Sequence, residues 1–253
     1  MFSAVFLLTV LLPTVLAAPT ASSANPALTA RSGPAAGTII TQCTAPNTIA
    51  LTFDDGPWQY EGAILSALEA AGAKATFFVT GTLYNCIYTQ STSLKAAFAA
   101  GHQIGSHTWT HKSLDSQSAA SITTEMTKLE TAFANILGVK PTYMRPPNGR
   151  AGGPVAGVMK TLGYRIVTWD IDSEDWNKVS AAASEAKFTA ASSGTSHIGL
   201  MHETIPTTSS TLVPWLLNWA KTKGLKMVTV AECLGDKDGA YTTAAEKTGA
   251  TSC

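Results

Sequence analysis

Short apolar segments alternate with helical segments from Thr48 onward, and this alternation constrains the fold more than any other feature. Each apolar segment is bounded by Gly, Pro or polar residues, as β-strands are. The expected strands are 48–53, 75–79, 103–106, 142–144, 164–168, 197–201 and 226–230. The expected helices are 60–71, 91–100, 118–137, 153–162, 179–191 and 211–223. Seven β/α repeats without an obvious antiparallel hairpin predict parallel strands that close into a barrel or form an open sheet.

Glycine positions and bulk composition agree with this reading. Gly72, Gly138, Gly163 and Gly224 each follow an expected helix, where a left-handed residue often ends the helix. With 253 residues, of which 45% are hydrophobic, the chain is long enough for one full-size α/β domain. The formal net charge is zero, so we expect neither nucleic acid nor a membrane as a partner.

The first residues have the pattern of a secretory signal peptide. Residues 2–12 are mostly apolar, and small residues follow up to Ala17 and Ala18, after which we expect cleavage. The apolar run is too short to span a membrane comfortably, and Pro13 interrupts it. We therefore expect a signal peptide over 1–18, an Ala/Ser/Pro/Thr-rich linker or pro-segment over 19–37 and a folded domain over 38–253. The protein should be secreted, into the extracellular space or the cell wall.

An even number of cysteines in a secreted chain favours disulfides. The four are Cys43, Cys86, Cys233 and Cys253. Two bridges can be drawn in three ways, and the sequence leaves all three open. We favour Cys43–Cys233, which would tie the first core segment to the last, and Cys86–Cys253, which would pin the tail. A zinc site made of thiolates is not expected, because the chain has no CxxC pair.

Carboxylates and imidazoles stand at the ends of expected strands, the rim where α/β barrels build active sites. Asp54 and Asp55 precede a Gly-Pro turn that can bring both carboxylates into one pocket, although the same sequence makes a good structural turn. His107 and His111 are four residues apart, so on a helix or tight turn both imidazoles can reach one ion. With Asp55 they form a set that suits zinc, with other divalent ions as alternatives. His202 alone would more often be a structural residue.

Two loops that follow expected strands also carry reactive or binding side chains. Arg145 opens a Pro-Pro-Asn-Gly loop and can clamp a carboxylate, while Gly149 lets the backbone approach a ligand. A purely structural loop is an equal alternative there. The other loop holds three acids and Trp176, an indole that can support a sugar ring. We expect His102 and His197 to be structural.

In order and approximate spacing, these motifs resemble the five motifs of the polysaccharide deacetylases, the carbohydrate esterase family 4 enzymes that share the NodB homology domain. The matching segments are 52–57, 107–111, 145–149, 172–176 and 200–202. The resemblance covers about residues 38–235, and the layout is most similar to that of fungal chitin deacetylases. It implies a distorted (β/α)7 barrel of the NodB homology type, with the catalytic domain over 38–253.

The resemblance also implies catalytic roles. The implied metal ligands are Asp55, His107 and His111. Asp54 would be the general base that deprotonates the attacking water, and Arg145 would hold it ionised and oriented. His202 would be the general acid that protonates the leaving nitrogen, and Asp175 would tune it by a hydrogen bond. The expected cofactor is Zn²⁺, with Co²⁺ or another divalent ion as alternatives.

Substrate contacts follow from the same resemblance. The implied substrate-binding residues are Pro147, Asn148, Gly149, Trp176 and Leu200. Leu200 would pack against the acetyl methyl group, Trp176 would wall the groove, and a backbone N–H of the Pro147–Asn148 loop would stabilise an oxyanion. The family often has a tyrosine at the position of Asn148, so the resemblance specifies the chemistry more closely than the substrate.

The leading prediction is a secreted, metal-dependent, monomeric deacetylase that hydrolyses N-acetyl groups of chitin or chitooligosaccharides to glucosamine units and acetate. An acetylxylan esterase and a peptidoglycan deacetylase would use the same site. An inactive carbohydrate-binding protein on the same fold should have lost a ligand or the base, and this chain keeps them all. A serine esterase is disfavoured because no Gly-x-Ser-x-Gly segment occurs.

Overall fold

A computed structural model describes residues 1–2, 33–191 and 196–253. All but the first two residues of the expected signal peptide, and most of the expected linker, lie outside these residues, so the boundaries predicted there stay predictions. Among the described residues, none of the helices combines the length and the apolar character that crossing a bilayer requires.

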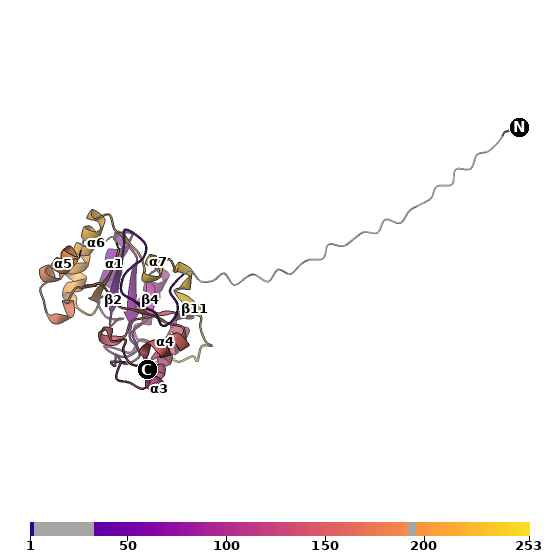
Figure 1. The fold of residues 1–253 in the computed structure, drawn as a ribbon, viewed down its shortest axis with the longest axis horizontal. Coiled ribbons are helices and arrows are strands. Elements are labelled where there is room, and N and C mark those ends of the chain that lie inside the picture. The colour runs from indigo at the N-terminus through magenta and orange to yellow at the C-terminus, as the bar shows by residue number, and fades with distance from the viewer. Residues whose placement is uncertain (3–32, 192–195) are drawn as a thin grey trace. The chain divides into compact units, whose positions relative to one another are not determined.

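A nine-stranded parallel sheet forms the centre of the fold (Figure 1). Its strands are β1 (Ile39–Ile40), β2 (Thr48–Asp54), β3 (Ala75–Val79), β4 (Gln103–Ser106), β6 (Tyr143–Met144), β7 (Arg165–Val167), β8 (Ile171–Asp172), β9 (Ser196–His202) and β10 (Lys226–Met227). They follow the order β1-β7-β6-β4-β3-β2-β9-β8, and β10 pairs with the first residues of β2. The sheet curves into a half-barrel surrounded by helices, as expected for the (β/α)7 fold.

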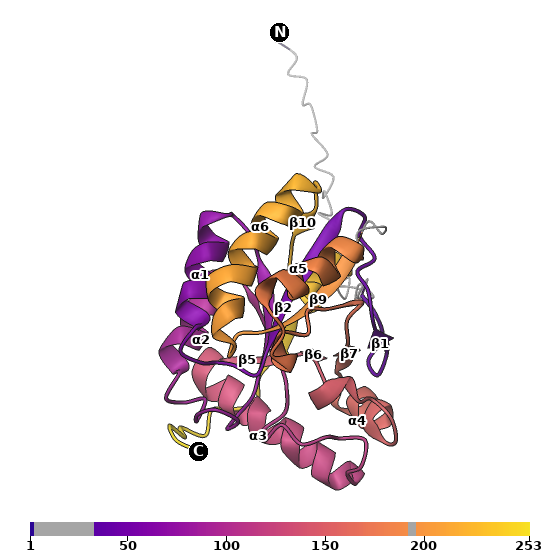
Figure 2. The ribbon, with the colours of Figure 1, turned by 90° about the vertical axis from the view of Figure 1, so that its left-hand side faces the viewer.

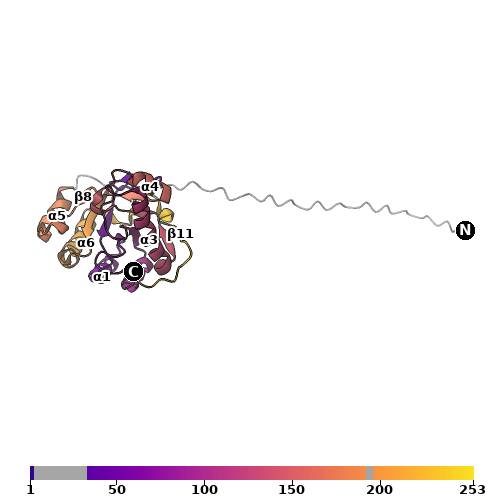
Figure 3. The same ribbon diagram turned by 90° about the horizontal axis from the view of Figure 1, so that it is seen from below.

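Helices cover the outer side of this sheet. They are α1 (Glu61–Ala70), α2 (Ser91–Ala99), α3 (Ala119–Leu137), α4 (Val155–Leu162), α5 (Ala181–Ala190), α6 (Val213–Thr222) and α7 (Val230–Cys233). In Figure 2, α1, α5 and α6 stand in front of the strands, with α3 and α4 below them. Seen from below, the same helices form an arc around the sheet (Figure 3).

The core explains why the strands read as continuous apolar runs. All residues of β2 and β3 are buried, because side chains on both faces of a covered parallel sheet are shielded from water. Phe53 and Phe77 stack with ring centroids 5.2 Å apart. On α3, a stripe that includes Met126, Leu129 and Phe133 faces the interior. Residues at the carboxyl ends of the strands therefore stand on a rigid base.

Most expected elements form within a residue or two of their predicted bounds, and the differences have local causes. The segment 226–230 ends as a strand at Met227, because the hydroxyl of Thr229 accepts a hydrogen bond from the Glu232 N–H at 3.1 Å and begins α7. Within the segment 142–144, Tyr143 and Met144 form β6, and a separate strand, β5 (Val139–Pro141), comes just before it.

Four short strands were not predicted. They are β1, β5, β8 and β11 (Tyr241–Thr243). The pairing of β11 with β5 is antiparallel and joins segments far apart in sequence, so it does not appear as a hairpin. The expected left-handed residues after helices are confirmed, with φ between 63° and 85° at Gly72, Gly138, Gly163 and Gly224.

Both favoured disulfides are present. Cys43 bonds to Cys233, and Cys86 bonds to Cys253. The first joins the segment before β2 to α7, and the second fixes the C-terminal segment to the loop that follows β3. The second bridge therefore holds a loop at the same end of the sheet as the predicted catalytic residues.

Candidate active site

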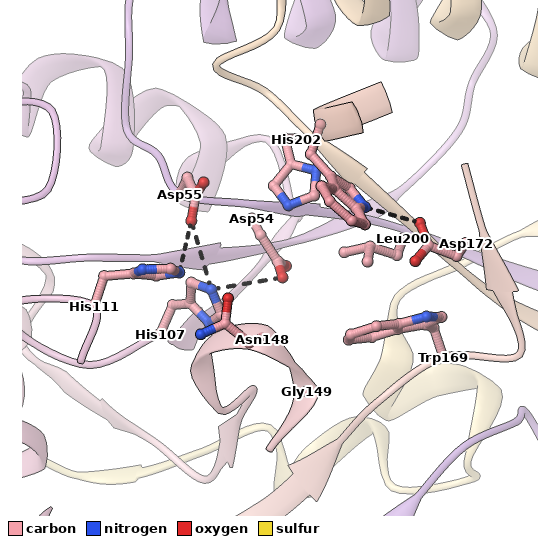
Figure 4. A pocket seen from close by; sticks show the side chains of 11 residues that line it. Asp54, Asp55, His107, His111, Asn148, Gly149, Trp169, Asp172, Leu200 and His202 are labelled. Atoms are coloured by element: carbon pink, nitrogen blue, oxygen red, sulfur yellow. Dashed lines mark hydrogen bonds and ion pairs between the residues drawn. The ribbon is translucent and has the colours of Figure 1, made fainter. Parts of the chain in front are cut away.

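Three predicted metal ligands meet at the carboxyl edge of the sheet (Figure 4). Asp55 Oδ1 lies 3.5 Å from His107 Nε2 and 3.3 Å from His111 Nε2. Two ligand atoms bound tetrahedrally to zinc at about 2.0–2.1 Å would lie about 3.3 Å apart. The spacing of the three atoms therefore fits a single ion of that size.

The protonation of this trio also suits a cation. His107 Nδ1 lies 2.7 Å from the carbonyl oxygen of Arg145, which can only accept, so Nδ1 carries the proton and Nε2 keeps its lone pair. Burial and the nearby His107 lower the pKa of His111, which favours its neutral, ligating form. Asp55 Oδ1 is buried and has no hydrogen-bond partner among the described residues, a costly state that a bound cation would relieve.

Backbone geometry places the two imidazoles. The segment from His107 to His111 is a loop rather than a helix, with φ of 73° at Thr108 and 59° at His111. The Thr108 hydroxyl accepts a hydrogen bond from the His111 N–H at 3.1 Å and closes the turn. Asp55 also has a positive φ, 76°. Such non-glycine positions cost about 1–3 kcal/mol each and cluster at functional sites.

Asp54 is held by the buried guanidinium of Arg145. Arg145 Nη1 donates to Asp54 Oδ1 at 2.8 Å and to the Thr52 hydroxyl at 2.7 Å, while Nε and Nη2 donate to two backbone carbonyls at the end of β7 and just after it. Burial lowers the pKa of Arg145, and the Asp54 charge opposes that effect. The other carboxylate oxygen, Asp54 Oδ2, lies 3.6 Å from His107 Nε2 and faces the metal trio.

His202 stands on the neighbouring strand, directly opposite Asp54 in the β2–β9 register. Its Nδ1 lies 2.7 Å from Asp175 Oδ1, and Asp175 Oδ2 accepts from the His202 backbone N–H at 2.8 Å and from the Thr208 hydroxyl at 2.6 Å. Burial alone would lower the pKa of His202. The hydrogen bond and charge of Asp175, together with the charges of Asp54 and Asp55, raise this pKa to about 9. The imidazole is therefore a proton donor at neutral pH.

These groups surround a pocket of about 300 Å³. Its lining residues are Asp54, Asp55, His107, His111, Asn148, Gly149, Trp169, Asp172, Trp176, Leu200 and His202. Figure 4 places the histidine ligands at one end of the pocket and Asp172 with Trp169 at the other. Trp176 is 54% exposed, and its indole Nε1 donates to Asp172 Oδ1 at 3.3 Å. Leu200 lies between the two ends and is almost fully buried.

The loop after β6 forms one wall. Asn148 has a φ of 58°, and its side-chain Nδ2 donates to the Ser113 hydroxyl at 2.8 Å. A Cβ atom on Gly149 would lie 2.7 Å from the Trp169 ring, so only glycine allows this close packing. Pro147, also predicted to bind substrate, is buried at the start of the short helix Pro147–Gly149 and is not among the lining residues.

Sequence reasoning missed several residues that shape this site. Thr52 lies two residues before Asp54 on β2, so strand alternation could have placed both on one face. Trp169 lies just after β7, where the strand-end rule could have singled it out. Asp172, the last residue of β8, lies in the acidic motif 172–176 but was given no role of its own. No sequence signal pointed to Thr208, which reaches Asp175 from a distant segment.

The remaining two histidines take structural positions. His102 Nδ1 accepts a hydrogen bond from the Ala75 backbone N–H at 3.2 Å, and burial together with Lys74 lowers its pKa to about 4. His197 is buried with Nδ1 2.6 Å from Asp170 Oδ2. Neither lines the pocket.

Comparison with known proteins identifies the family. The family model described as polysaccharide deacetylase matches residues 41–167. A chitin deacetylase from Pestalotiopsis sp is 43% identical over 220 residues, which are 85% of this chain and 73% of that protein. A peptidoglycan-N-acetylglucosamine deacetylase from Listeria monocytogenes is 35% identical over 190 residues, which are 75% of this chain and 39% of the relative. The solved structure of the chitin deacetylase from the fungal pathogen Colletotrichum lindemuthianum superposes with a TM-score of 0.80 at 33% identity, covering 84% of this chain and 99% of that one. With its open parallel half-barrel and this pattern of matches, the chain belongs to the polysaccharide deacetylase family.

Proposed function

We propose that this protein hydrolyses the N-acetyl groups of chitin or chitooligosaccharides, releasing acetate and leaving glucosamine units. The observation that carries the proposal is that three kinds of group line one pocket. They are the possible metal ligands Asp55, His107 and His111, the carboxylate of Asp54 bonded to Arg145, and His202 with its raised pKa. Relatives named chitin deacetylase, at 43% sequence identity and at a TM-score of 0.80, support chitin as the polymer.

The metal site fits a divalent cation, and we assign zinc to Asp55, His107 and His111. Mixed imidazole and carboxylate ligands suit zinc, with Co²⁺ or another divalent ion as alternatives. A divalent ion bound there supplies Lewis-acid chemistry, polarising the acetamide carbonyl and making a nearby water more acidic.

Asp54 is assigned as the general base. The bond from Arg145 engages Oδ1, which leaves Oδ2 facing the pocket to accept a proton from the attacking water. The same bond fixes the orientation of the carboxylate. The two adjacent acids thus have separate roles, since Asp54 is paired with Arg145 and Asp55 with the two histidines.

His202 is assigned as the general acid. An amine is a poor leaving group unless its nitrogen is protonated, and His202 holds a proton at neutral pH for that transfer. Asp175 stabilises the imidazolium and fixes the ring through Nδ1, which leaves Nε2 to donate.

Substrate contacts are assigned to the walls of the same pocket. Leu200 offers an apolar surface to the acetyl methyl group, and Trp176 offers an exposed ring face to the sugar. The backbone N–H of Asn148, on the pocket wall, is assigned as the donor to the oxyanion that develops during attack.

A second candidate is peptidoglycan deacetylation, which the Listeria relative favours. It would use the same residues on a different N-acetylated polymer. We also propose that the protein is secreted, since its two disulfides suit an oxidising compartment. We further propose that it acts as a monomer.

The decisive experiment compares acetate release from chitin oligomers, peptidoglycan fragments and acetylated xylan by the zinc-loaded protein, with EDTA as a control. We expect EDTA-sensitive release from chitin oligomers, with one free amine formed per acetate. Release only from peptidoglycan fragments would support the second candidate. Release only from xylan would change the substrate to an O-acetyl ester, and release from none would contradict an enzymatic role.

A further inference from the structure

Two buried glutamates beside the site take no part in the chemistry assigned above. Glu203 directly follows the proposed acid His202, and Glu61 is the first residue of α1. Both residues are fully shielded from solvent, with 0% exposure. Glutamates are almost never fully buried unless they are paired, so each of these two should have a partner that offsets its burial.

The Glu203 carboxylate fastens the turn that carries Asp55. Its Oε1 accepts a hydrogen bond from the Trp58 backbone N–H at 2.8 Å. A Cβ atom added to Gly56 would lie 1.8 Å from the same oxygen, so the turn packs directly on this carboxylate. On the other side of the turn, the Gly56 carbonyl accepts from the Thr80 backbone N–H at 2.8 Å, just after β3. The turn is therefore held between the ends of β9 and β3.

Glu61 lies against the same turn. Its backbone N–H donates to the Trp58 carbonyl at 3.1 Å, and its Oε2 accepts a hydrogen bond from the Ser93 hydroxyl on α2. Each glutamate nevertheless keeps one buried carboxylate oxygen that has no hydrogen-bond partner in the part of the chain that the structure describes. These two oxygens are Glu61 Oε1 and Glu203 Oε2.

The electrostatic surroundings of Glu203 favour its protonated form. The charged side chains with the largest effect on it are all acids, namely Glu61, Asp55 and Asp54. Burial and these charges raise the pKa of Glu203 well above its ordinary value, and burial raises the pKa of Glu61 to about 7. A cation bound to Asp55 would offset the two aspartate charges but would leave the burial and the charge of Glu61 in place. Two buried carboxylates without a cation of their own are costly when both are ionised, so one of them should hold a proton.

We propose that Glu203 is a positioning residue for the deacetylase site and acts as a neutral carboxylic acid, with the proton on Oε2 donated to Glu61 Oε1. This inference rests on the proposed function. One proton gives both buried oxygens a partner, because the hydroxyl donates and the facing carboxylate accepts. The other oxygen, Oε1, continues to hold the Trp58 N–H. The metal ligand Asp55 and the acid His202, which come from the ends of two neighbouring strands, are thereby kept at a fixed separation.

The test compares Glu203→Gln with Glu203→Ala in the full chain. Glutamine keeps the acceptor for the Trp58 N–H and supplies an amide N–H in place of the carboxylic O–H, whereas alanine removes both. In Glu203→Ala the dissociation constant for zinc should rise about tenfold and kcat on chitin hexamer should fall about tenfold. KM should not change, because Glu203 is not among the residues that line the pocket. Glu203→Gln should match the wild type in all three quantities.

Infrared spectroscopy detects the proton itself and does not depend on turnover. The wild type at neutral pH should show a carboxylic-acid C=O band that is lost in Glu203→Gln. Identical spectra in that region would overturn the neutral acid, as would a Glu203→Gln variant that is as impaired as Glu203→Ala. Wild-type zinc affinity and kcat in Glu203→Ala would overturn the positioning role.

Two further controls keep the outcomes distinct. Melting temperatures show whether Glu203→Ala folds, and if it does not, Glu203→Gln and the infrared band decide the question. A wild-type protein that shows the expected infrared band and the expected zinc affinities but releases no acetate would contradict the proposed function. The role of Glu203 in holding the metal site would then remain supported.

Discussion

Replacing Asp175 with asparagine should move the pH range in which the enzyme works. In the wild type His202 has a pKa of about 9, so the proton donor is present below that pH and is lost as the pH rises through it. The asparagine side chain would keep an acceptor for His202 Nδ1 but remove the carboxylate charge. The difference between about 9 and the ordinary 6.5 corresponds to about 3 kcal/mol of stabilisation of the imidazolium.

The assay is kcat for acetate release from chitin hexamer between pH 5 and pH 10. If Asp175 supplies most of the raised pKa, the protonated fraction of His202 at pH 8 falls about thirtyfold in the variant and kcat falls with it, while near pH 6 the loss is small. The control is His202→Ala, which should lack the alkaline limb altogether. An alkaline limb at the wild-type position in Asp175→Asn would refute the assignment of His202 as an acid tuned by Asp175.

Four further variants separate the catalytic roles of the site residues from their effects on stability. Asp54→Asn should lower kcat about 10²- to 10⁴-fold but still bind one zinc per chain, measured by atomic absorption. His107→Ala should lose both the bound zinc and the activity. Loss of zinc in the Asp54 variant would reverse the roles assigned to Asp54 and Asp55. Arg145→Leu should lower the free energy of unfolding in urea by about 3–5 kcal/mol, because it leaves the buried Asp54 carboxylate without its guanidinium partner, and an unchanged free energy would show that this pair does not stabilise the fold. In the double variant Cys86→Ser/Cys253→Ser, the free energy of unfolding should fall by about 2–4 kcal/mol in the same assay. An unchanged free energy of unfolding would mean that the disulfide does not stabilise the folded chain relative to the unfolded one.

The strand framework was predictable because its physical signal is local. Buried parallel strands such as β2 and β3 are continuous apolar runs, and glycines mark the helix ends. Both signals can therefore be recognised within a few consecutive residues. The strands β1 and β11 have two and three residues and depend on partners about a hundred residues or more away. No local window contains that information.

The site was predictable in its residue types but less so in its supporting contacts. Asp54, Asp55 and the histidines carry side chains that are rare in apolar surroundings, so their positions at strand ends stood out. Thr52 and Thr208 are ordinary threonines in sequence, and only the fold shows that their hydroxyls bond to the Arg145 guanidinium and the Asp175 carboxylate. The loop form of the His107–His111 segment likewise depends on left-handed backbone angles that the residue types do not suggest.

Zinc titration of the metal-free protein tests the central claim most directly. Acetate release from chitin hexamer should be absent without metal, rise in proportion to added zinc and level off at one zinc per chain, and His111→Ala should need far more metal to reach any activity. Full activity in the metal-free protein, or saturation at one zinc per chain with no release of acetate, would contradict the assignment of this pocket as a metal-dependent deacetylase site.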